Sequence, residues 1–232
     1  TAAGSGNIVI TALHSTLAAD LSNLSKGSGS ITAAFDGTDT FTGNLGTAGV
    51  VVTVADSFTM TAAANIVAGS DKTINKVSNG ALAVEVGSAD ANVDLTTITG
   101  TAFASVTVTQ DVTFTGTLDD TVGTSINNGI TLTTAAAKVT GKTVSGNGSI
   151  VIEGVGASTD LSNVNPAGGV TGTLADGINI SSNSNLGNID SFTLDNNASV
   201  TVSIAQNAKI STATGTNTVT LSEAGTATGA TG

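Results

Sequence analysis

Cysteine, tryptophan, tyrosine and arginine are absent from the 232 residues of this chain, which has one proline and one histidine. Without cysteine the chain has no disulfide, no thiol nucleophile and no cysteine-based metal site. Arginine is the main residue for bidentate contact with phosphates and bases, so its absence argues against nucleic-acid binding. Most of the polar side chains of this sequence carry hydroxyl, amide or carboxylate groups, beside six lysines and one histidine.

Charge is scarce and mostly negative. Only 10% of the residues are charged, and 17 acidic residues against six lysines give a formal net charge of −11. An anionic membrane surface repels this charge, and no apolar run approaches the roughly 20 residues of a membrane-spanning helix, so we expect no direct membrane insertion. Divalent cations are the partners that the charge favours, although the acid excess also serves solubility.

Short runs rich in valine, isoleucine and threonine recur from end to end, separated by glycine, asparagine and aspartate. Most alternate with a period of two, which is the pattern of β-strands. Helix signals are few and lie at residues 14–24 and 133–138. The predicted strands are residues 7–11, 30–35, 50–54, 57–61, 73–77, 82–86, 93–98, 105–109, 112–118, 130–134, 138–144, 149–155, 170–174, 178–181, 191–194, 199–204, 209–212 and 218–222.

Two architectures fit these strands. A β-sandwich usually fills the space between its sheets with large aromatic side chains, and six phenylalanines are the only aromatics here. The narrow interior of a solenoid is filled by smaller aliphatic residues, and Ile150, Val170 and Ile189 recur at about one solenoid coil of 20 residues. We therefore predict an all-β, parallel β-solenoid (β-helix) of short strands, with tandem β-sandwich domains as the alternative.

The chain contains an internal repeat. Residues 20–24 are Asp-Leu-Ser-Asn-Leu and residues 160–164 are Asp-Leu-Ser-Asn-Val, and the Asp-Gly pairs at 36–37 and 176–177 follow at the same offset of 140 residues. Such reiteration indicates a repeat architecture. We predict a first solenoid superunit at residues 1–146, a second, incomplete superunit at 147–224, and a linker or severed end at 225–232.

No catalytic constellation is visible. His14 has no cysteine or second histidine as a partner, and the sequence contains no nucleophile elbow, phosphate loop or zinc-protease motif. Polysaccharide-cleaving β-helix enzymes use clustered aspartates with cationic and aromatic residues, whereas the one adjacent acid pair here, Asp119-Asp120, occurs in a chain without arginine, tyrosine or tryptophan. We predict that the chain is not an enzyme.

Calcium is the one cofactor that the sequence suggests. Ca²⁺ takes six to eight oxygen ligands, which aspartates in turns can supply. Asp-Gly is also an ordinary turn pair, and the glycine-rich nonapeptide of calcium-binding β-helices is absent, so turn acids remain the other interpretation. The candidate ligands are Asp36, Asp39, Asp119, Asp120, Asp176 and Asp190.

Threonine pairs of the form Thr-x-Thr suggest a further function. They occur at residues 107/109, 113/115, 131/133 and 218/220. Stacked on one face of a solenoid, they would form an ice-binding lattice. Such a face needs a strict coil period, which these pairs lack, and threonine is also a good residue for an exposed strand. Ice binding is therefore kept as an alternative.

The repeated pieces resemble coils of bacterial surface-layer (S-layer) proteins and of related RTX-type, type I-secreted β-solenoid adhesins. The repeated pieces that carry this resemblance are the Ile-Val-Ile strand, the Asp-Leu-Ser-Asn-hydrophobic run, Asp-Gly, Leu-Gly and Asp-Ser-Phe-Thr-hydrophobic. They occur in an acidic, cysteine-free chain. The resemblance implies an extracellular structure on the bacterial cell surface, often calcium-dependent and anchored through another part of the polypeptide.

We therefore expect a structural, self-assembling S-layer lattice segment whose partners are further copies of itself, in a lattice or fibre. The stalk of a secreted calcium-dependent adhesin and an ice-binding protein are the alternatives.

Overall fold

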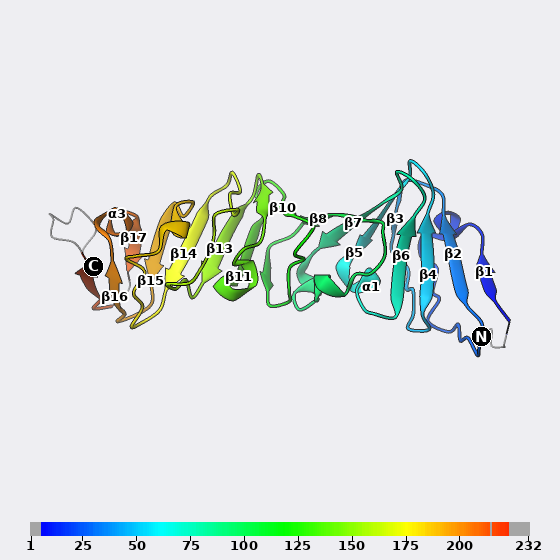
Figure 1. The fold of residues 1–232 in the computed structure, drawn as a ribbon, viewed down its shortest axis with the longest axis horizontal. Coiled ribbons are helices and arrows are strands. Elements are labelled where there is room, and N and C mark those ends of the chain that lie inside the picture. Colours follow the sequence, from blue (N-terminus) through cyan, green and yellow to red (C-terminus); the bar gives the residue numbers. More distant parts are fainter. Residues whose placement is uncertain (1–5, 214, 223–232) are drawn as a thin grey trace. The chain divides into compact units, whose positions relative to one another are not determined.

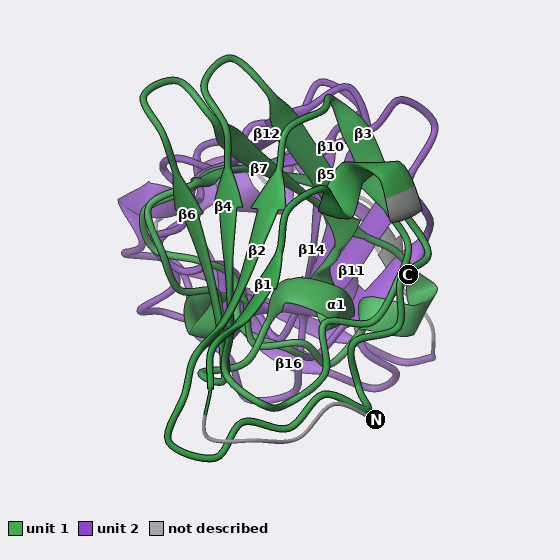
Figure 2. Cartoon of the chain, turned by 90° about the vertical axis from the view of Figure 1, so that its right-hand side faces the viewer, with its two compact units in different colours: residues 1–109, 116–124 green, residues 110–115, 125–232 purple. Residues whose placement is uncertain are grey.

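The computed structural model describes residues 6–213 and 215–222. The chain divides into two compact units, coloured separately in Figure 2, and both are built from short strands joined by turns (Figure 1). Unit 1 contains Thr1–Thr109 and Gly116–Thr124, and unit 2 contains Gln110–Thr115 and Ser125–Gly232.

Unit 1 contains two sets of parallel strands. One set pairs in the order β1 (Ile8–Ile10), β2 (Ile31–Phe35), β4 (Val50–Val54) and β6 (Lys72–Lys76). The other pairs in the order β3 (Asp39–Phe41), β5 (Thr59–Ala63), β7 (Ala81–Val86) and β8 (Phe103–Val108). From β2 to β7 the chain alternates between the two sets, whereas β1 and β2 both belong to the first set and β7 and β8 both belong to the second.

Unit 2 follows the same plan. Its main sheet pairs in the order β9 (Val112–Phe114), β11 (Thr131–Ala135), β13 (Ser149–Glu153), β14 (Val170–Leu174), β15 (Ser191–Leu194) and β17 (Ile210–Ala213), all parallel. β16 (Ser199–Val202) pairs with β18 (Thr218–Leu221), also in parallel. The remaining short strands are β10 (Thr124–Ile126) and β12 (Val144–Gly146).

The helices of the described residues are single turns at coil corners. The α-helical turns are α1 (Ala64–Val67), α2 (Ala136–Val139) and α3 (Ile204–Asn207). The 3-10 turns are η1 (Leu13–Thr16), η2 (Ser88–Asp90), η3 (Leu95–Thr97) and η4 (Ser184–Leu186). No helix in the described part of the chain has the length and apolar character needed to cross a membrane.

Neighbouring strands of a sheet lie one coil apart in sequence. Leu132 pairs with Ile150, and Ile150 pairs with Val170, so one coil takes about 20 residues. The prediction of an all-β, parallel β-solenoid is confirmed. The tandem β-sandwich alternative is wrong, because the strands of a sandwich pair antiparallel.

Alternate residues of each strand fill the interior. In β2, Ile31, Ala33 and Phe35 are buried, whereas Thr32 and Ala34 between them are only half-buried. The parallel register places each inward residue above an inward residue of the next coil. The core is therefore a stack of aliphatic rungs, into which four fully buried phenylalanines fit: Phe35, Phe41, Phe114 and Phe192.

One rung shows how a large ring is accommodated. Gly172 of β14 pairs with Phe192 of β15 and points inward. A Cβ atom at Gly172 would lie 3.3 Å from the ring of Phe192 and 3.0 Å from Ile189 Cδ1. Glycine suits this inward position because the neighbouring side chains occupy most of the space that a larger residue would need.

Several predicted elements are wrong. Residues 93–98 contain η3 instead of a strand, because Asp94 Oδ1 accepts the N–H group of Thr96 at 3.0 Å and turns the backbone. Residues 138–144 fall largely in α2 and a turn at Gly141, whose φ is +73°. Residues 178–181 contribute only an isolated bridge at Asn179, and the helix predicted at 14–24 is limited to η1.

The spacing signal was correct in part, because Ile150 and Val170 do pair. The partner of Val170 in the next coil is Asp190, whose N–H group donates to Val170 O at 2.9 Å, so Ile189 is one residue out of register. The predicted superunits at 1–146 and 147–224 describe sequence repeats and stay a prediction. The boundary between the two compact units falls between residues 109 and 125, and residues 225–232 lie outside the described residues.

The stacked core predicts a large difference between the two sides of one strand. Ile150 is 0% exposed, whereas Val151 beside it faces outward. We expect Ile150→Ala to lower the free energy of unfolding by about 2–5 kcal/mol through lost burial and a residual cavity. Val151→Ala is the matched control and should change it by about 0.5 kcal/mol. Urea unfolding measures both, and equal losses would contradict the inward–outward assignment.

Candidate functional site: coil corners and threonine rows

Three of the candidate calcium ligands accept backbone N–H groups. Asp119 Oδ1 accepts from the N–H groups of residues 121 and 122, both at 2.7 Å. Asp176 Oδ1 accepts from Ser199 at 2.7 Å, and Asp190 Oδ2 accepts from Val170 at 2.8 Å. These carboxylates satisfy backbone donors in a turn and at the first residues of β14 and β16.

The other candidates are placed differently. Asp36 contacts Nδ1 of His14, which lies in η1, while Asp39 begins β3 and Asp120 lies in a turn, both exposed. Within residues 6–213 and 215–222, no three His, Asp or Glu side chains gather into a group that could hold a metal ion. The geometry favours the interpretation as turn acids, and calcium binding stays a prediction.

Asp20 and Asp160, which begin the two copies of the sequence repeat, build the same corner. Each carboxylate accepts the N–H group two residues further on, at 2.9 Å and 3.0 Å respectively. The next residue, a buried leucine, donates its N–H group to a carbonyl of the following coil at 2.7 Å and 3.1 Å. The fifth residue then donates to the carbonyl of that leucine, at 3.0 Å in both copies. The repeat is therefore a structural corner.

Two further corners of this kind were missed in the sequence. Asp94 Oδ1 accepts the N–H group of residue 96 at 3.0 Å, and Leu95 donates to Thr117 O at 2.9 Å. Asn179 Oδ1 accepts the N–H group of residue 181 at 3.1 Å, and Ile180 donates to the carbonyl of residue 201 at 2.9 Å. The shared signal, Asp or Asn followed by Leu or Ile and then Ser or Thr, would have found them.

Other carboxylates connect one coil to the next. Asp56 Oδ1 accepts the backbone N–H of Asn79 at 3.0 Å and its Nδ2 at 3.2 Å. Asp111 Oδ1 accepts the N–H of Thr131 at 2.7 Å, one coil further on. Hydrogen bonds to a charged acceptor are stronger than neutral ones, so these acids fix the stacking of the turns.

Hydrogen bonding holds the pKa of three corner carboxyls below its ordinary value. For Asp20 and Asp160 the donors are the hydroxyl and N–H groups of Ser22 and Ser162, with the hydroxyl leading at Asp20 and the N–H at Asp160. For Asp56 the main cause is the backbone N–H of Asn79. Since these bonds favour the ionised form, the negative charge of each carboxylate strengthens its turn.

The outward side of the first sheet of unit 1 carries a row of short, uncharged side chains. The strand register places Thr32 beside Val51 and Val51 beside Thr73, and an isolated bridge adds Thr99. The hydroxyl groups of Thr73 and Thr99 lie 3.3 Å apart and share a hydrogen bond. We call these four residues threonine row 1.

The main sheet of unit 2 carries an equivalent row. Register places Thr113, Thr133, Val151, Thr171 and Ser191 beside one another across β9, β11, β13, β14 and β15. The hydroxyl groups of Thr171 and Ser191 are hydrogen-bonded at 3.2 Å. These five residues form threonine row 2, and neither row contains a charged residue.

Sequence reasoning missed the rows because it looked for Thr-x-Thr within single strands. Each strand contributes one residue to a row, and the parallel register brings these residues together from positions about 20 apart. Only Thr113 and Thr133 of the predicted pairs lie in row 2. The rows offer a repeated pattern of hydroxyl and methyl groups for many weak contacts.

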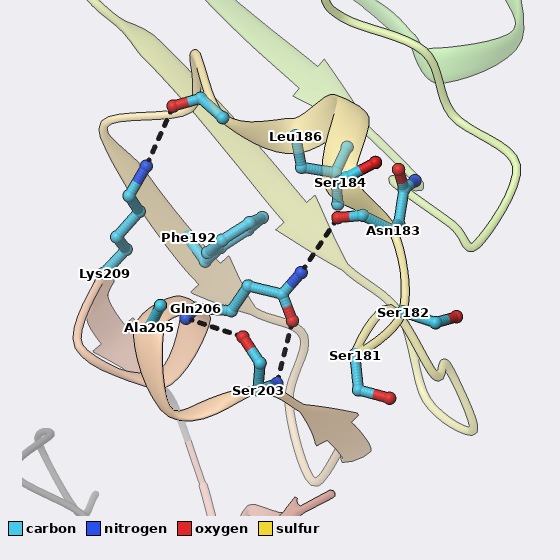
Figure 3. A pocket seen from close by; sticks show the side chains of 11 residues that line it. Ser181, Ser182, Asn183, Ser184, Leu186, Phe192, Ser203, Ala205, Gln206 and Lys209 are labelled. Atoms are coloured by element: carbon cyan, nitrogen blue, oxygen red, sulfur yellow. Dashed lines mark hydrogen bonds between the residues drawn. The ribbon is translucent and has the colours of Figure 1, made fainter. Parts of the chain in front are cut away.

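A pocket of about 310 Å³ lies in unit 2 beside α3 (Figure 3). Its amide and ammonium groups already serve local structure. Gln206 Oε1 accepts from Ser203 N–H at 2.9 Å and its Nε2 donates to Ile180 O at 2.9 Å, while Lys209 Nζ donates to Gly187 O at 3.1 Å. These bonds hold the α3 turn against the preceding coil and support a structural role for the pocket lining.

Comparison with family models, with curated proteins and with solved structures finds no match to this chain.

The lowered carboxyl pKa values predict acid sensitivity. A lowered folded-state pKa contributes stability above the ordinary pKa of aspartate, and this stability is lost as the pH falls through the folded-state value, below about 4. A variant with Asp20→Asn, Asp56→Asn and Asp160→Asn keeps oxygen acceptors, as Asn179 does naturally. It should therefore lose less stability between neutral and acidic pH than the natural chain.

Urea unfolding midpoints at both pH values measure this difference. The alanine triple variant is the control for the acceptor itself and should be destabilised at both pH values. Equal acid-induced losses in the natural chain and the asparagine variant would contradict the role of the charge.

Proposed function

We propose that this chain is a structural segment of a bacterial cell-surface protein and that it self-associates into a lattice or fibre. The observation that carries the proposal is the use of its polar side chains. The acids and amides described above accept hydrogen bonds from, or donate them to, backbone groups of their own or neighbouring coils. For example, Asp176 accepts the N–H group of Ser199, and Asp190 accepts that of Val170. A chain whose carboxylates serve its own turns is suited to mechanical continuity more than to catalysis.

The threonine rows supply the surface for lateral contact. Threonine, serine and valine have few rotatable bonds, so ordering them in an interface costs little conformational entropy. Charged residues are absent from both rows, whereas the chain as a whole carries a net charge of −11. Contact through the rows therefore avoids burying unpaired charges, which is strongly unfavourable.

The cell-surface location rests on the resemblance of the repeated runs to S-layer proteins and β-solenoid adhesins. Absence of cysteine and a surplus of acids are compatible with that setting. In this proposal Ca²⁺ acts by bridging acidic chains.

Assembly tests the proposal directly. We expect the purified chain to form ordered sheets or fibres in negative-stain electron microscopy, more readily with Ca²⁺ than without it. Thr133→Glu together with Thr171→Glu places charges in threonine row 2 and should raise the concentration needed for assembly at least about tenfold, because buried unpaired charges are costly.

The matched control places the same two charges in an exposed turn, as Ala157→Glu with Ser158→Glu, and should assemble like the natural chain. A strictly monomeric chain with and without Ca²⁺ would refute self-assembly and favour the adhesin stalk. Equal effects of both variants would remove the role of row 2.

The threonine rows also favour a second candidate, ice binding. Parallel strands repeat the hydroxyl and methyl groups at the strand spacing of about 4.8 Å, a regular pattern on which water can order. Row 2 departs from a pure threonine lattice at Val151 and Ser191. The self-association proposal needs no such regularity and is preferred.

Thermal hysteresis measures ice binding. If row 2 binds ice, the natural chain separates melting and freezing temperatures, and the row 2 glutamate variant loses this effect while the exposed-turn control retains it. No hysteresis in the natural chain, at concentrations where it remains monomeric, would eliminate ice binding.

A further inference from the structure

The sequence contains three Asn-Gly pairs, at residues 79–80, 128–129 and 147–148. The backbone nitrogen that follows an asparagine can attack the side-chain amide, and a following glycine presents no side chain to hinder the approach. The reaction requires that this nitrogen be released from hydrogen bonding and that the local backbone can rearrange. The three pairs differ in both respects.

Two of the pairs are held in place. The N–H group of Gly80 donates to Val77 O at 2.9 Å, and that of Gly148 donates to Ile126 O at 3.0 Å. Both glycines are also crowded, since a Cβ atom would lie 2.5 Å from Val54 O at Gly80 and 2.4 Å from Asn127 O at Gly148. Attack at either pair therefore requires local opening of the structure.

The pair Asn128-Gly129 lies in an open turn. Ile130 N–H donates to Asn127 O at 3.1 Å, and Gly129 has a φ of +75°, as expected for the third residue of a type II turn. Within the described residues the N–H group of Gly129 donates to no acceptor. A Cβ atom added at Gly129 would have no atom within 4 Å apart from those of the glycine itself and its two chain neighbours. Residues 127–129 are all exposed.

We propose that Asn128 is a site of spontaneous deamidation in the folded protein. The Gly129 nitrogen gives its proton to solvent base and attacks Cγ of Asn128, so a new C–N bond closes a five-membered succinimide. The bond from Cγ to Nδ2 breaks and ammonia leaves with a proton from water. A second water molecule then adds to either ring carbonyl and opens it to an aspartyl or isoaspartyl residue. Water is the only co-reactant, and nothing is oxidised or reduced.

The product alters the turn that leads into β11. It adds a negative charge, and the isoaspartyl form also inserts a backbone methylene between residues 128 and 129. The carbonyl of Ile130, next to this turn, accepts the N–H group of Ser149 at 2.9 Å. The hydroxyl groups of Thr131 and Ser149 are also hydrogen-bonded to each other. The modification therefore acts on the stacking of β11 against β13.

Ageing of the intact chain in mildly alkaline buffer, followed by peptide mapping with mass spectrometry, tests the assignment. We expect deamidation at Asn128 at least about tenfold faster than at Asn79 or Asn147, since each of those requires a backbone hydrogen bond to break. In urea-unfolded protein the three sites should react at similar rates, which shows that the fold sets the difference.

Asn128→Ser removes the reactive amide and should abolish the acidic species that accumulates fastest in ion-exchange chromatography, with no change in circular dichroism. Asn147→Ser is the matched control and should leave that species unchanged. Equal rates at the three sites of the folded chain, or faster reaction at position 79 or 147, would overturn the proposal.

Discussion

Parallel backbone hydrogen bonding at a spacing of one coil is the interaction on which this structure depends. It requires the chain to turn back after each strand and return to the same sheet about 20 residues later, as from Ile150 to Val170. A core this narrow buries few large side chains, so its stability depends on continuous stacking of aliphatic rungs. The register also fixes what the outside presents, because residues that alternate with the core become the threonine rows.

The corners satisfy the backbone groups that the strands cannot. At Asp20 and Asp160 a carboxylate accepts a backbone N–H and a buried leucine follows, so one short run both turns the chain and anchors it. Asn179 makes the same turn with an amide oxygen. Part of the excess of acidic residues therefore consists of carboxylates that accept backbone N–H groups. Because such turns recur along the chain, these aspartates are spread along it as well.

Composition and period-two patterning were sufficient to predict the parallel solenoid, because small aliphatic residues without tryptophan or tyrosine suit a narrow interior. Local hydrogen bonds between side chains and the backbone were harder to predict. Residues 93–98 have strand-forming side chains, but Asp94 accepts the N–H group of Thr96 and the chain forms a 3-10 turn. The threonine rows could not be found from adjacent residues, because Thr133, Val151 and Thr171 meet only through register. The metal candidates were chosen by oxygen content alone, which does not reveal the backbone donors beside Asp119 or Asp190.

Residue-resolved amide hydrogen exchange tests most directly that the acids build the fold. The N–H groups of Ser199, Thr131 and Val170 are bound by Asp176, Asp111 and Asp190. The account predicts that these three amides exchange at least about tenfold more slowly than the unbonded amide of Gly129, and that alanine at the partner aspartate removes the protection. Rapid exchange of all three in the natural chain, at the rate of the Gly129 amide, would contradict it.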